Sequence, residues 1–197
     1  MRRTLILGGA AAFAALILPS TSHASQARRI TLRHQHTGAR FSGIWHDGEA
    51  PDPVAMQELS EVLADAGATP VRPFNADALD IVWQIAAATN LDSELDIHSG
   101  YRTPRINRAV HGAGDSQHLR ASAMDVGVPW RRLSAVSDAA RKLSRGGVGI
   151  YRSFVHLDSG PVRYWGGGSG RAGSMQPTVS RLDNIAEAWR GAAASRR

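Results

Sequence analysis

Two histidines and one aspartate occur in an order that could bind a metal ion. His118 and Asp125 are seven positions apart, and His156 follows Asp125 after thirty-one more. Imidazole nitrogens and a carboxylate oxygen are common zinc ligands, and three of them leave a fourth position open for water, as in catalytic zinc sites. The pattern therefore predicts a metal-assisted hydrolase.

The spacing of these residues indicates which elements must position them. Seven positions fit neither the i,i+4 spacing of a helical H-E-x-x-H site nor one face of a strand. We therefore expect the chain to bend, with His118 on a loop and Asp125 on the strand after it. Within residues 154–158, His156 and Asp158 are two apart, so on a strand they would share one face. Each residue alone also fits a solvated or structural role, and the hypothesis depends on their occurring together.

The surrounding sequence predicts an α+β fold, in which a small antiparallel sheet carries Asp125 and His156 and helices pack on one side. Alternating residues predict strands over 29–34, 40–45, 94–99, 123–128, 148–151 and 154–158. Helical spacing and capping residues predict helices over 52–65, 75–89 and 130–143, a short one from Thr103, and a last candidate over 180–194. The first two strands would form a hairpin that pairs with the main sheet or covers it.

The first 24 residues have the features of an export signal peptide. Arg2 and Arg3 precede an apolar run over residues 5–18, which is too short for an ordinary membrane anchor. Residues 22–24 resemble a small-x-small cleavage site. The paired arginines favour the twin-arginine route over an ordinary Sec signal. By either route we expect a periplasmic protein with no stable membrane span after signal removal.

Composition limits the remaining possibilities. The 197 residues suit one domain, which we place at 25–165, followed by a glycine-rich flexible tail over 166–197. The chain has no cysteine, so disulfides and thiolate ligands are excluded. Its net charge of +6 falls to about +4 without the signal, which contains two arginines and no acidic residue. A basic exported protein suits an anionic envelope polymer, and the dispersed arginines do not indicate a nucleic-acid partner.

Three separated motifs together resemble a known family. They are SGYR at residues 99–102, S-x-H-x(6)-D at 116–125, and the glycine-rich and FVHLD segments within 146–163. These motifs resemble the zinc D-Ala-D-Ala metallopeptidases and their hedgehog-like relatives, most closely the YcbK-like branch of murein endopeptidase K type. The resemblance implies that His118, Asp125 and His156 bind Zn²⁺. It also implies that Arg102 faces the scissile carbonyl and that Ser116 lies beside the substrate.

By this resemblance the chain is expected to hydrolyse peptide stems or cross-links of peptidoglycan as a murein endopeptidase. Zinc would polarise the peptide carbonyl, and the guanidinium of Arg102 would stabilise the developing oxyanion. Two alternatives stay open, a D,D-carboxypeptidase and a zinc-stabilised, catalytically weak cell-wall binding module. A metal-free scaffold would not explain the three ligand types in the family's order.

Two positions depart from the wider family pattern. Related branches carry a glutamate general base three residues before the last histidine ligand, where this chain has Ser153. Asp158 could serve as the catalytic base instead, with a slight preference for this role, or could orient His156 from behind. Ala121 replaces a family glycine, and a turn of positive φ there would be strained.

Aromatic residues near the motifs admit two interpretations. Trp130, Tyr164 and Trp165 could line a groove for glycan or peptide, although such side chains more often belong to the core or to a covering segment. His98 and His111 lie near the motifs in sequence but match no ligand position of the pattern. We therefore leave both histidines out of the expected metal site.

Overall fold

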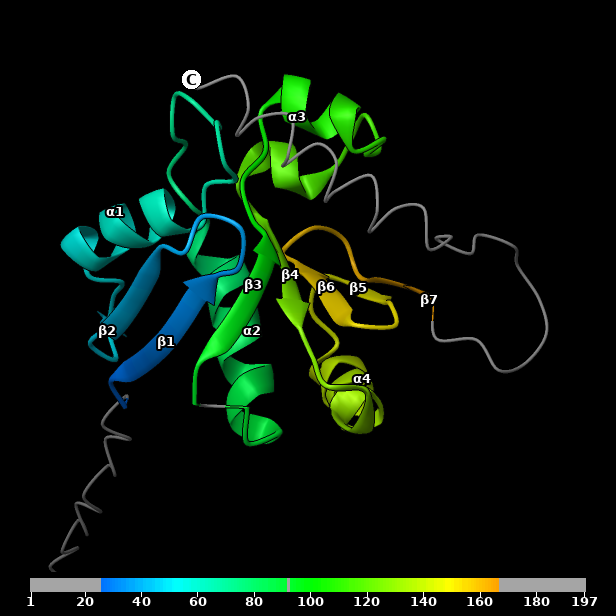
Figure 1. Ribbon diagram of the computed structural model, residues 1–197. Coiled ribbons are helices and arrows are strands. Elements are labelled where there is room, and N and C mark those ends of the chain that lie inside the picture. The colour runs from blue at the N-terminus through cyan, green and yellow to red at the C-terminus, as the bar shows by residue number, and fades with distance from the viewer. Residues whose placement is uncertain (1–25, 92, 167–197) are drawn as a thin grey trace, which may run out of the picture.

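One mixed sheet of seven strands organises the protein, of which the computed structural model describes residues 26–91 and 93–166 (Figure 1). The strands are β1 (Arg28–His34), β2 (Arg40–His46), β3 (Leu95–Ser99), β4 (Ala123–Gly127), β5 (Gly147–Ile150), β6 (Phe154–Asp158) and β7 (Arg163–Gly166). The helices are α1 (Pro53–Val62), α2 (Ala76–Ala88), α3 (Pro104–Ala109) and α4 (Leu133–Leu143), with short 3₁₀ turns η1 (Gln117–Arg120) and η2 (Trp130–Arg132). The expected α+β class is confirmed.

The sheet is larger than the small antiparallel sheet expected from the sequence. Its strand order is β2-β1-β3-β4-β6-β5-β7. The predicted hairpin joins the sheet, because β1 pairs in parallel with β3. At the other edge β7, which was not predicted, pairs in parallel with β5. The pairs in the middle of the sheet, β3 with β4, β4 with β6 and β6 with β5, are antiparallel, as expected for the strands that carry the site.

The helices begin where their capping residues predict. Asp52, Asn75 and Thr103 accept hydrogen bonds at the starts of α1, α2 and α3, and the first and last of these helices open with proline. Helices α1, α2 and α4 cover one face of the sheet (Figure 1). Alternate residues of β4 and β6, such as Val126 and Val155, meet α2 on this face. The other face of β4 and β6 is left for the site.

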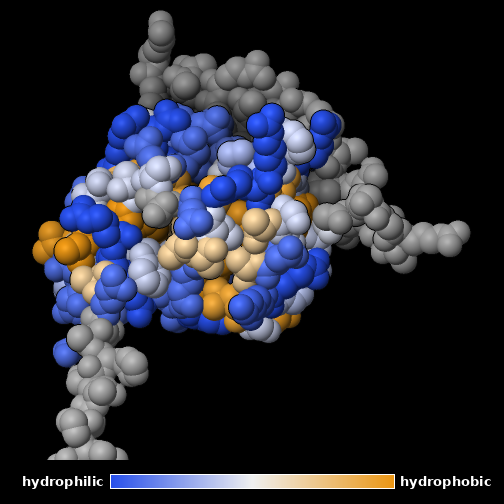
Figure 2. Space-filling model, turned by 90° about the horizontal axis from the view of Figure 1, so that it is seen from below, coloured by the Kyte–Doolittle hydropathy of each residue, from blue (hydrophilic) through white to orange (hydrophobic). Residues whose placement is uncertain are grey.

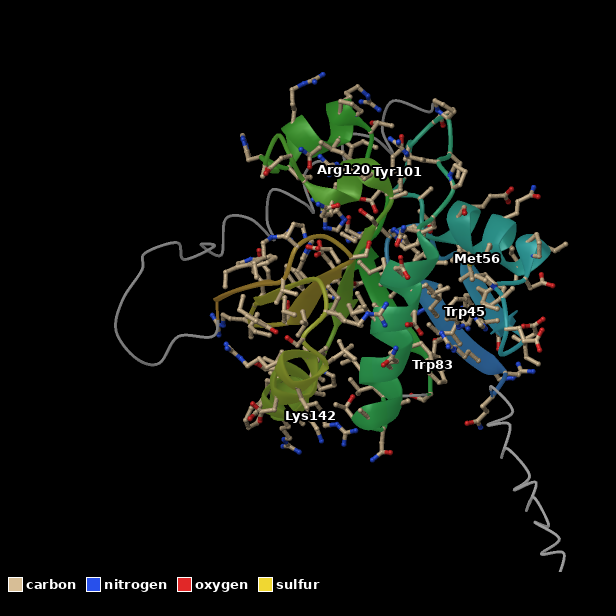
Figure 3. The ribbon with its side chains drawn as sticks, turned by 180° about the vertical axis from the view of Figure 1, so that it is seen from behind. Trp45, Met56, Trp83, Tyr101, Arg120 and Lys142 are labelled. Atoms are coloured by element: carbon tan, nitrogen blue, oxygen red, sulfur yellow. The ribbon has the colours of Figure 1, made fainter. Side chains whose placement is uncertain are left out.

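The amino-terminal hairpin is fixed to α2 by one arginine. The guanidinium of Arg28 lies over the rings of Trp45 and Trp83, with its carbon 5.9 and 5.4 Å from the ring centroids. The same guanidinium bonds the Asp80 carboxylate at 2.5 Å. Viewed from behind, the two tryptophans lie at adjoining places on the hairpin and α2 (Figure 3). The hairpin is thus packed against α2 as an integral part of the domain.

Two sequence predictions fall on residues that the structure does not describe. The expected export signal and nearly all of the glycine-rich tail, including its helix candidate, lie outside the described residues. Gly166, which we assigned to the tail, is the last residue of β7. In the described part of the chain, no helix has the length and apolar character needed to cross a membrane.

Seen from below, the described surface is mainly hydrophilic, with hydrophobic side chains in small separate areas (Figure 2). The large hydrophobic residues that are exposed come from different elements: Ile44, Val54, Val71, Trp130, Val162 and Tyr164. Scattered exposure of this kind is ordinary for a globular domain and does not by itself mark a binding surface.

Candidate metal site and cleft

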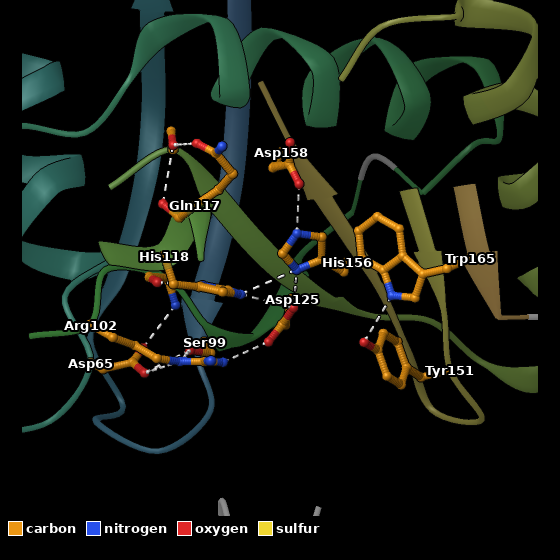
Figure 4. A network of polar contacts seen from close by, with 12 residues as sticks. Asp65, Ser99, Arg102, Gln117, His118, Asp125, Tyr151, His156, Asp158 and Trp165 are labelled. Atoms are coloured by element: carbon orange, nitrogen blue, oxygen red, sulfur yellow. Dashed lines mark hydrogen bonds and ion pairs between the residues drawn. The ribbon is translucent and has the colours of Figure 1, made fainter. Parts of the chain in front are cut away.

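Three side chains that we predicted as metal ligands converge on the open face of the sheet (Figure 4). His118 Nε2 lies 3.2 Å from His156 Nδ1 and 3.3 Å from Asp125 Oδ1. His156 Nδ1 lies 2.9 Å from the same Asp125 oxygen. All three residues are buried. Ligands bound to zinc at about 2.0 to 2.2 Å in tetrahedral geometry are about 3.3 to 3.6 Å apart. The two distances from His118 are close to this range, and the distance between His156 and Asp125 is a few tenths of an ångström shorter.

Strand register brings two of the three residues together. Asp125 on β4 lies directly opposite His156 on β6, and opposed residues of an antiparallel pair share one face. His118 comes from η1, a 3₁₀ turn where we expected a loop. The turn ends at Ala121, which adopts φ 53° and ψ 40° in the left-handed region. The positive φ that we considered for this family-glycine position is therefore present, and alanine adopts it.

Hydrogen bonds behind the two histidines orient their inner nitrogens. His118 Nδ1 lies 2.6 Å from the Gly100 carbonyl oxygen, so it must donate and leave Nε2 as an acceptor. His156 Nε2 lies 2.8 Å from Asp158 Oδ2, so in the neutral ring Nδ1 is also an acceptor. With the Asp125 carboxylate, three acceptor atoms then face one point. A cation is needed to hold such a cluster together, which makes this donor set a fit for a metal ion.

The protonation tendencies of the triad follow from burial and neighbouring charges. Burial and the positive charge of Arg102 lower the pKa of His118, which favours its neutral, ligating form. Burial alone would raise the pKa of Asp125, but the two histidines beside it hold that pKa well below the usual range. Burial would lower the pKa of His156, yet the carboxylates of Asp125 and Asp158 raise it. Protons and a metal ion therefore compete for His156.

Arg102 lies beside the triad, between two carboxylates. Its Nη2 donates to Asp125 Oδ2 at 2.8 Å, and its Nε donates to Ser99 Oγ at 2.7 Å. Its side chain is 4% exposed and lines the cleft described below. Ser99 reaches this place because β3 carries an irregularity between Ile97 and Ser99, which sets Ser99 opposite Asp125. A β-bulge of this kind moves a side chain to the other face of a sheet.

Asp158 lies behind His156 and is fully buried. Its Oδ1 accepts from the backbone N–H groups of Gly147 and Gly160, and its Oδ2 accepts from His156 and from Arg163 at 2.7 Å. Burial raises the pKa of Asp158, but these donors outweigh it and lower the pKa to about 2. The carboxylate is thus ionised and fully engaged, and it is not among the residues that line the cleft.

An open cleft of about 430 Å³ adjoins the triad. Its described lining consists of Arg102, Ala113, Asp115, Ser116, Gln117, His118, Asp125, Tyr151, Phe154, His156, Pro161, Arg163 and Trp165. Ser116, expected beside the substrate, therefore lies at the cleft. Of the three aromatic residues considered as groove walls, Trp165 lines the cleft, whereas Trp130 and Tyr164 do not. Trp130 is 73% exposed on η2, and the Tyr164 hydroxyl donates to the Arg141 carbonyl oxygen.

Two glycines of β5 let side chains of β7 reach the site. Gly149 stands between His156 on β6 and Trp165 on β7 in one row across the sheet. A Cβ at Gly149 would come within 2.4 Å of the Trp165 ring, which lies 5.2 Å from the His156 ring by centroids. In the next row, a Cβ at Gly147 would come within 2.6 Å of Arg163 Nη1. The motif's glycines therefore make room for the cleft wall and for the Arg163 contact to Asp158.

Several residues of the site were missed from the sequence. Tyr151 stacks on Phe154 with ring centroids 4.3 Å apart, and its hydroxyl accepts from Trp165 Nε1 at 3.1 Å. Asp65, which bonds Ser99 and Arg102 from behind, lies far from the motifs in sequence. His98 and His111, which we left out, do not belong to the converging group. The aromatic side chains beside the cleft could have been inferred from the glycines of β5, which leave room for large neighbours. No local feature of the sequence marks Asp65.

The fold and the triad define a class, α+β proteins that present two histidines and an aspartate at the open face of a sheet in a geometry suited to a catalytic metal. A family model described as peptidoglycan L,D-endopeptidase MepK matches residues 22–165. The chain therefore belongs to the MepK family, as the motifs predicted.

Individual relatives agree with this assignment. The chain is 29% identical over 175 residues to the peptidoglycan L,D-endopeptidase MepK of Escherichia coli K12, covering 83% of this chain and 96% of the relative. It is 30% identical over 178 residues to the probable peptidoglycan L,D-endopeptidase MepK of Haemophilus influenzae, covering 84% and 95%. The zinc D-Ala-D-Ala carboxypeptidase of Streptomyces albus G is 28% identical over 139 residues, covering 64% of this chain and 54% of that protein.

Proposed function

We propose that this protein is a zinc-dependent peptidoglycan peptidase that cleaves peptide cross-links as an endopeptidase. The observation that carries the proposal is the triad of His118, Asp125 and His156, whose three acceptor atoms face one point beside an open cleft. Membership of the MepK family supports the choice of peptidoglycan as substrate and of endopeptidase over carboxypeptidase. A zinc ion held by this triad would supply a Lewis acid for the scissile carbonyl and would activate a water nucleophile.

The protein's own side chains divide the remaining work. Arg102 lines the cleft next to Asp125, so its guanidinium would stabilise negative charge that develops on the scissile carbonyl oxygen. Ser116 and Trp165 lie on the cleft wall, where they would contact the peptide beside the cleaved bond. Because the three side chains of the triad are buried, water around them would be limited and these electrostatic effects would be stronger.

For Asp158 we propose the orienting role. Its carboxylate faces the outer nitrogen of His156 and lies away from the cleft, so it holds the imidazole and fixes its tautomer. A general base must reach the proton that it removes, directly or through one water. Asp158 is fully buried and accepts hydrogen bonds from four residues, which argues against that role. Of the described residues that line the cleft, Asp115 and Asp125 are the carboxylates, and Asp115 is exposed at the rim.

Digestion of purified muropeptides with the mature protein tests the proposal. Cross-linked dimers should shorten to monomers, a chelator should stop the reaction, and added zinc should restore it. Loss of only a terminal D-Ala would indicate the carboxypeptidase instead. Full hydrolysis by metal-depleted protein would refute the zinc mechanism.

A catalytically weak binding module is the second candidate. Ser153, where related branches carry a glutamate base, is exposed in the turn between β5 and β6 and does not line the cleft. Such a module would retain peptidoglycan sacculi in a pull-down assay without shortening any muropeptide. Release of monomers from dimers by the same preparation would exclude it.

We further propose that the protein is exported to the periplasm by the twin-arginine route, with residues 25–165 as the peptidase domain. Arg2, Arg3 and the apolar run after them support this part of the proposal. Replacing both arginines with lysine should keep a reporter fusion inside the cell. Continued export of the doubly substituted signal would point to the Sec route.

A further inference from the structure

Asp65, just after α1, is the centre of a buried cluster of hydrogen bonds behind the metal site (Figure 4). Its side chain is 1% exposed. Its Oδ1 accepts from the Gly100 backbone N–H at 2.8 Å and contacts His34 Nε2 at 3.2 Å. Its Oδ2 accepts from Ser99 Oγ at 2.6 Å and from Arg102 Nε at 3.3 Å. Both carboxylate oxygens are thereby fully used.

Two short routes lead from Asp65 to the site. In the first, Asp65 and Ser99 hold the Nε side of Arg102, whose Nη2 bonds Asp125 at 2.8 Å. In the second, Asp65 holds the N–H of Gly100, whose carbonyl oxygen accepts from His118 Nδ1 at 2.6 Å. One carboxylate thus supports the cleft-lining guanidinium and the backbone that orients a candidate ligand.

The negative charge of Asp65 also affects how strongly Arg102 attracts Asp125. The Arg102 guanidinium lies between Asp65 and Asp125, so its positive charge is shared by two buried carboxylates. Without the charge of Asp65, Arg102 would be left with Asp125 as its acidic partner in this cluster. Asp125 would then be drawn toward Arg102, and its Oδ1 would be a weaker partner for the two histidines.

We propose that Asp65 is a positioning residue for the reaction, acting through Arg102 on one side and through Gly100 and His118 on the other. This inference rests on the proposed zinc peptidase function. It differs from a structural role, in which Asp65 would only fasten α1, β1 and β3 together and would affect stability alone.

Asp80 provides a matched control. It is also a buried carboxylate bound by arginines, with Arg28 at 2.5 Å and Arg145 at 2.6 Å, but it lies on α2 and contacts no residue of the site. Asp65→Asn and Asp80→Asn each remove one buried negative charge that has arginine partners. Both should lower the stability of the fold.

The experiment compares zinc affinity, measured by competition with a chromogenic chelator, and kcat on cross-linked muropeptide dimers at saturating zinc. Asp65→Asn should weaken zinc binding by about 10- to 100-fold, the usual scale for groups that orient ligands, and should also lower kcat. Asp80→Asn should change neither. If both variants lose stability but keep the wild-type zinc affinity and kcat, Asp65 has only a structural role.

Ser99→Ala separates the two routes and serves if Asp65→Asn does not fold. It removes the hydroxyl between Asp65 and Arg102 but leaves Gly100 bonded to Asp65. Its kcat should fall about tenfold while its zinc affinity stays unchanged. An unaltered kcat would overturn the Arg102 route. If the wild type cleaves no muropeptide, the proposed function fails, whereas the effect of Asp65→Asn on zinc affinity still decides the route through His118.

Discussion

The two histidines of the triad are held by different kinds of structure. His156 belongs to a strand arm, which consists of His156, Asp158 and Arg163, and its outer nitrogen bonds a carboxylate. His118 belongs to a loop arm, which consists of Asp65, Ser99, Gly100, Arg102 and His118, and its outer nitrogen donates to a neutral backbone carbonyl. The strand arm is positioned by the register of β6 with β4 and β5. The loop arm depends on a bulge in β3 and on the left-handed residue after η1.

The different partners of the two histidines accompany opposite shifts of their pKa values. In the strand arm, burial lowers the pKa of His156, but Asp125 and, behind the ring, Asp158 outweigh burial and raise that pKa. In the loop arm, burial and Arg102 lower the pKa of His118 and keep it neutral. A metal ion bound between them would meet one imidazole backed by a carboxylate and one backed by a neutral carbonyl, with the Asp125 carboxylate common to both arms.

Removing either imidazole tests whether the arms are equivalent for metal binding, and this should be the largest effect. His118→Ala and His156→Ala should each abolish zinc retention and hydrolysis together, because two remaining ligands hold zinc poorly. Metal content by atomic absorption and muropeptide digestion provide the measurements. Zinc at one per chain in either variant would remove that histidine from the ligand set.

The positions of His156 and Asp158 in the strand arm could be predicted from the sequence, because they depend on a pattern within one short strand. Residues two apart on a strand share a face, so His156 and Asp158 were expected on one side, and their 2.8 Å contact bears this out. The first two strands and the helix starts at Asp52, Asn75 and Thr103 were also predicted, since turns and caps are short-range signals.

The loop arm and the sheet edges could not be predicted in the same way. The parallel pairing of β1 with β3 joins segments about sixty residues apart and has no local signal. Asp65 meets Ser99 only because a bulge turns Ser99 toward Asp125, and one inserted residue reverses the face of a side chain. The strand β7 has only four residues, too few for alternation to distinguish it from a turn.

Asp158→Asn tests the hydrogen bond from the outer nitrogen of His156 to a carboxylate, which has no equivalent at His118. If Asp158 orients His156, the change should weaken zinc affinity by about 10- to 100-fold, and excess zinc should restore much of the activity. If Asp158 is the general base, zinc should stay at about one per chain while turnover falls by roughly 10²-fold or more. Asp96→Asn on β3, whose side chain is 46% exposed, is a suitable control. Unchanged metal binding and turnover in Asp158→Asn would eliminate both roles.

Gly149→Ala tests whether β5 must lack a side chain at this position for Trp165 to pack beside His156. The new Cβ would lie 2.4 Å from the Trp165 ring and would push it away from His156. We expect a loss of about 1 to 3 kcal/mol in unfolding free energy, altered tryptophan fluorescence and a raised KM, with zinc affinity little changed. Gly114→Ala is a matched control, because a Cβ there meets nothing within 4 Å. A normal KM would show that Trp165 does not shape substrate binding.

Acid titration offers a smaller test of the loop arm. Burial raises the pKa of Asp65, but the His34 hydrogen bond and the charge of Arg102 outweigh it and hold the pKa below 3.8. Ionised Asp65 therefore stabilises the fold above pH 3.8, and this contribution is lost as the pH falls through the lowered pKa. In chelated protein, wild type should lose more unfolding free energy below pH 3.8 than Asp65→Asn does. Parallel curves from denaturant unfolding would contradict the assignment.

The smallest expected effect is that of Ala121→Gly. Glycine would relieve a left-handed conformation that costs alanine roughly 1 kcal/mol. It would also remove a buried methyl group that contributes about 0.8 kcal/mol, and it would raise the conformational entropy of the unfolded chain. These contributions oppose each other, so unfolding free energy should change by less than about 1 kcal/mol. The Ala121 backbone is bonded on both sides, from its N–H to the His118 carbonyl oxygen and from the Asn75 N–H to its own carbonyl oxygen. Zinc affinity should therefore stay at the wild-type value, and a fall in affinity would show that the methyl group itself holds η1 and His118 in place.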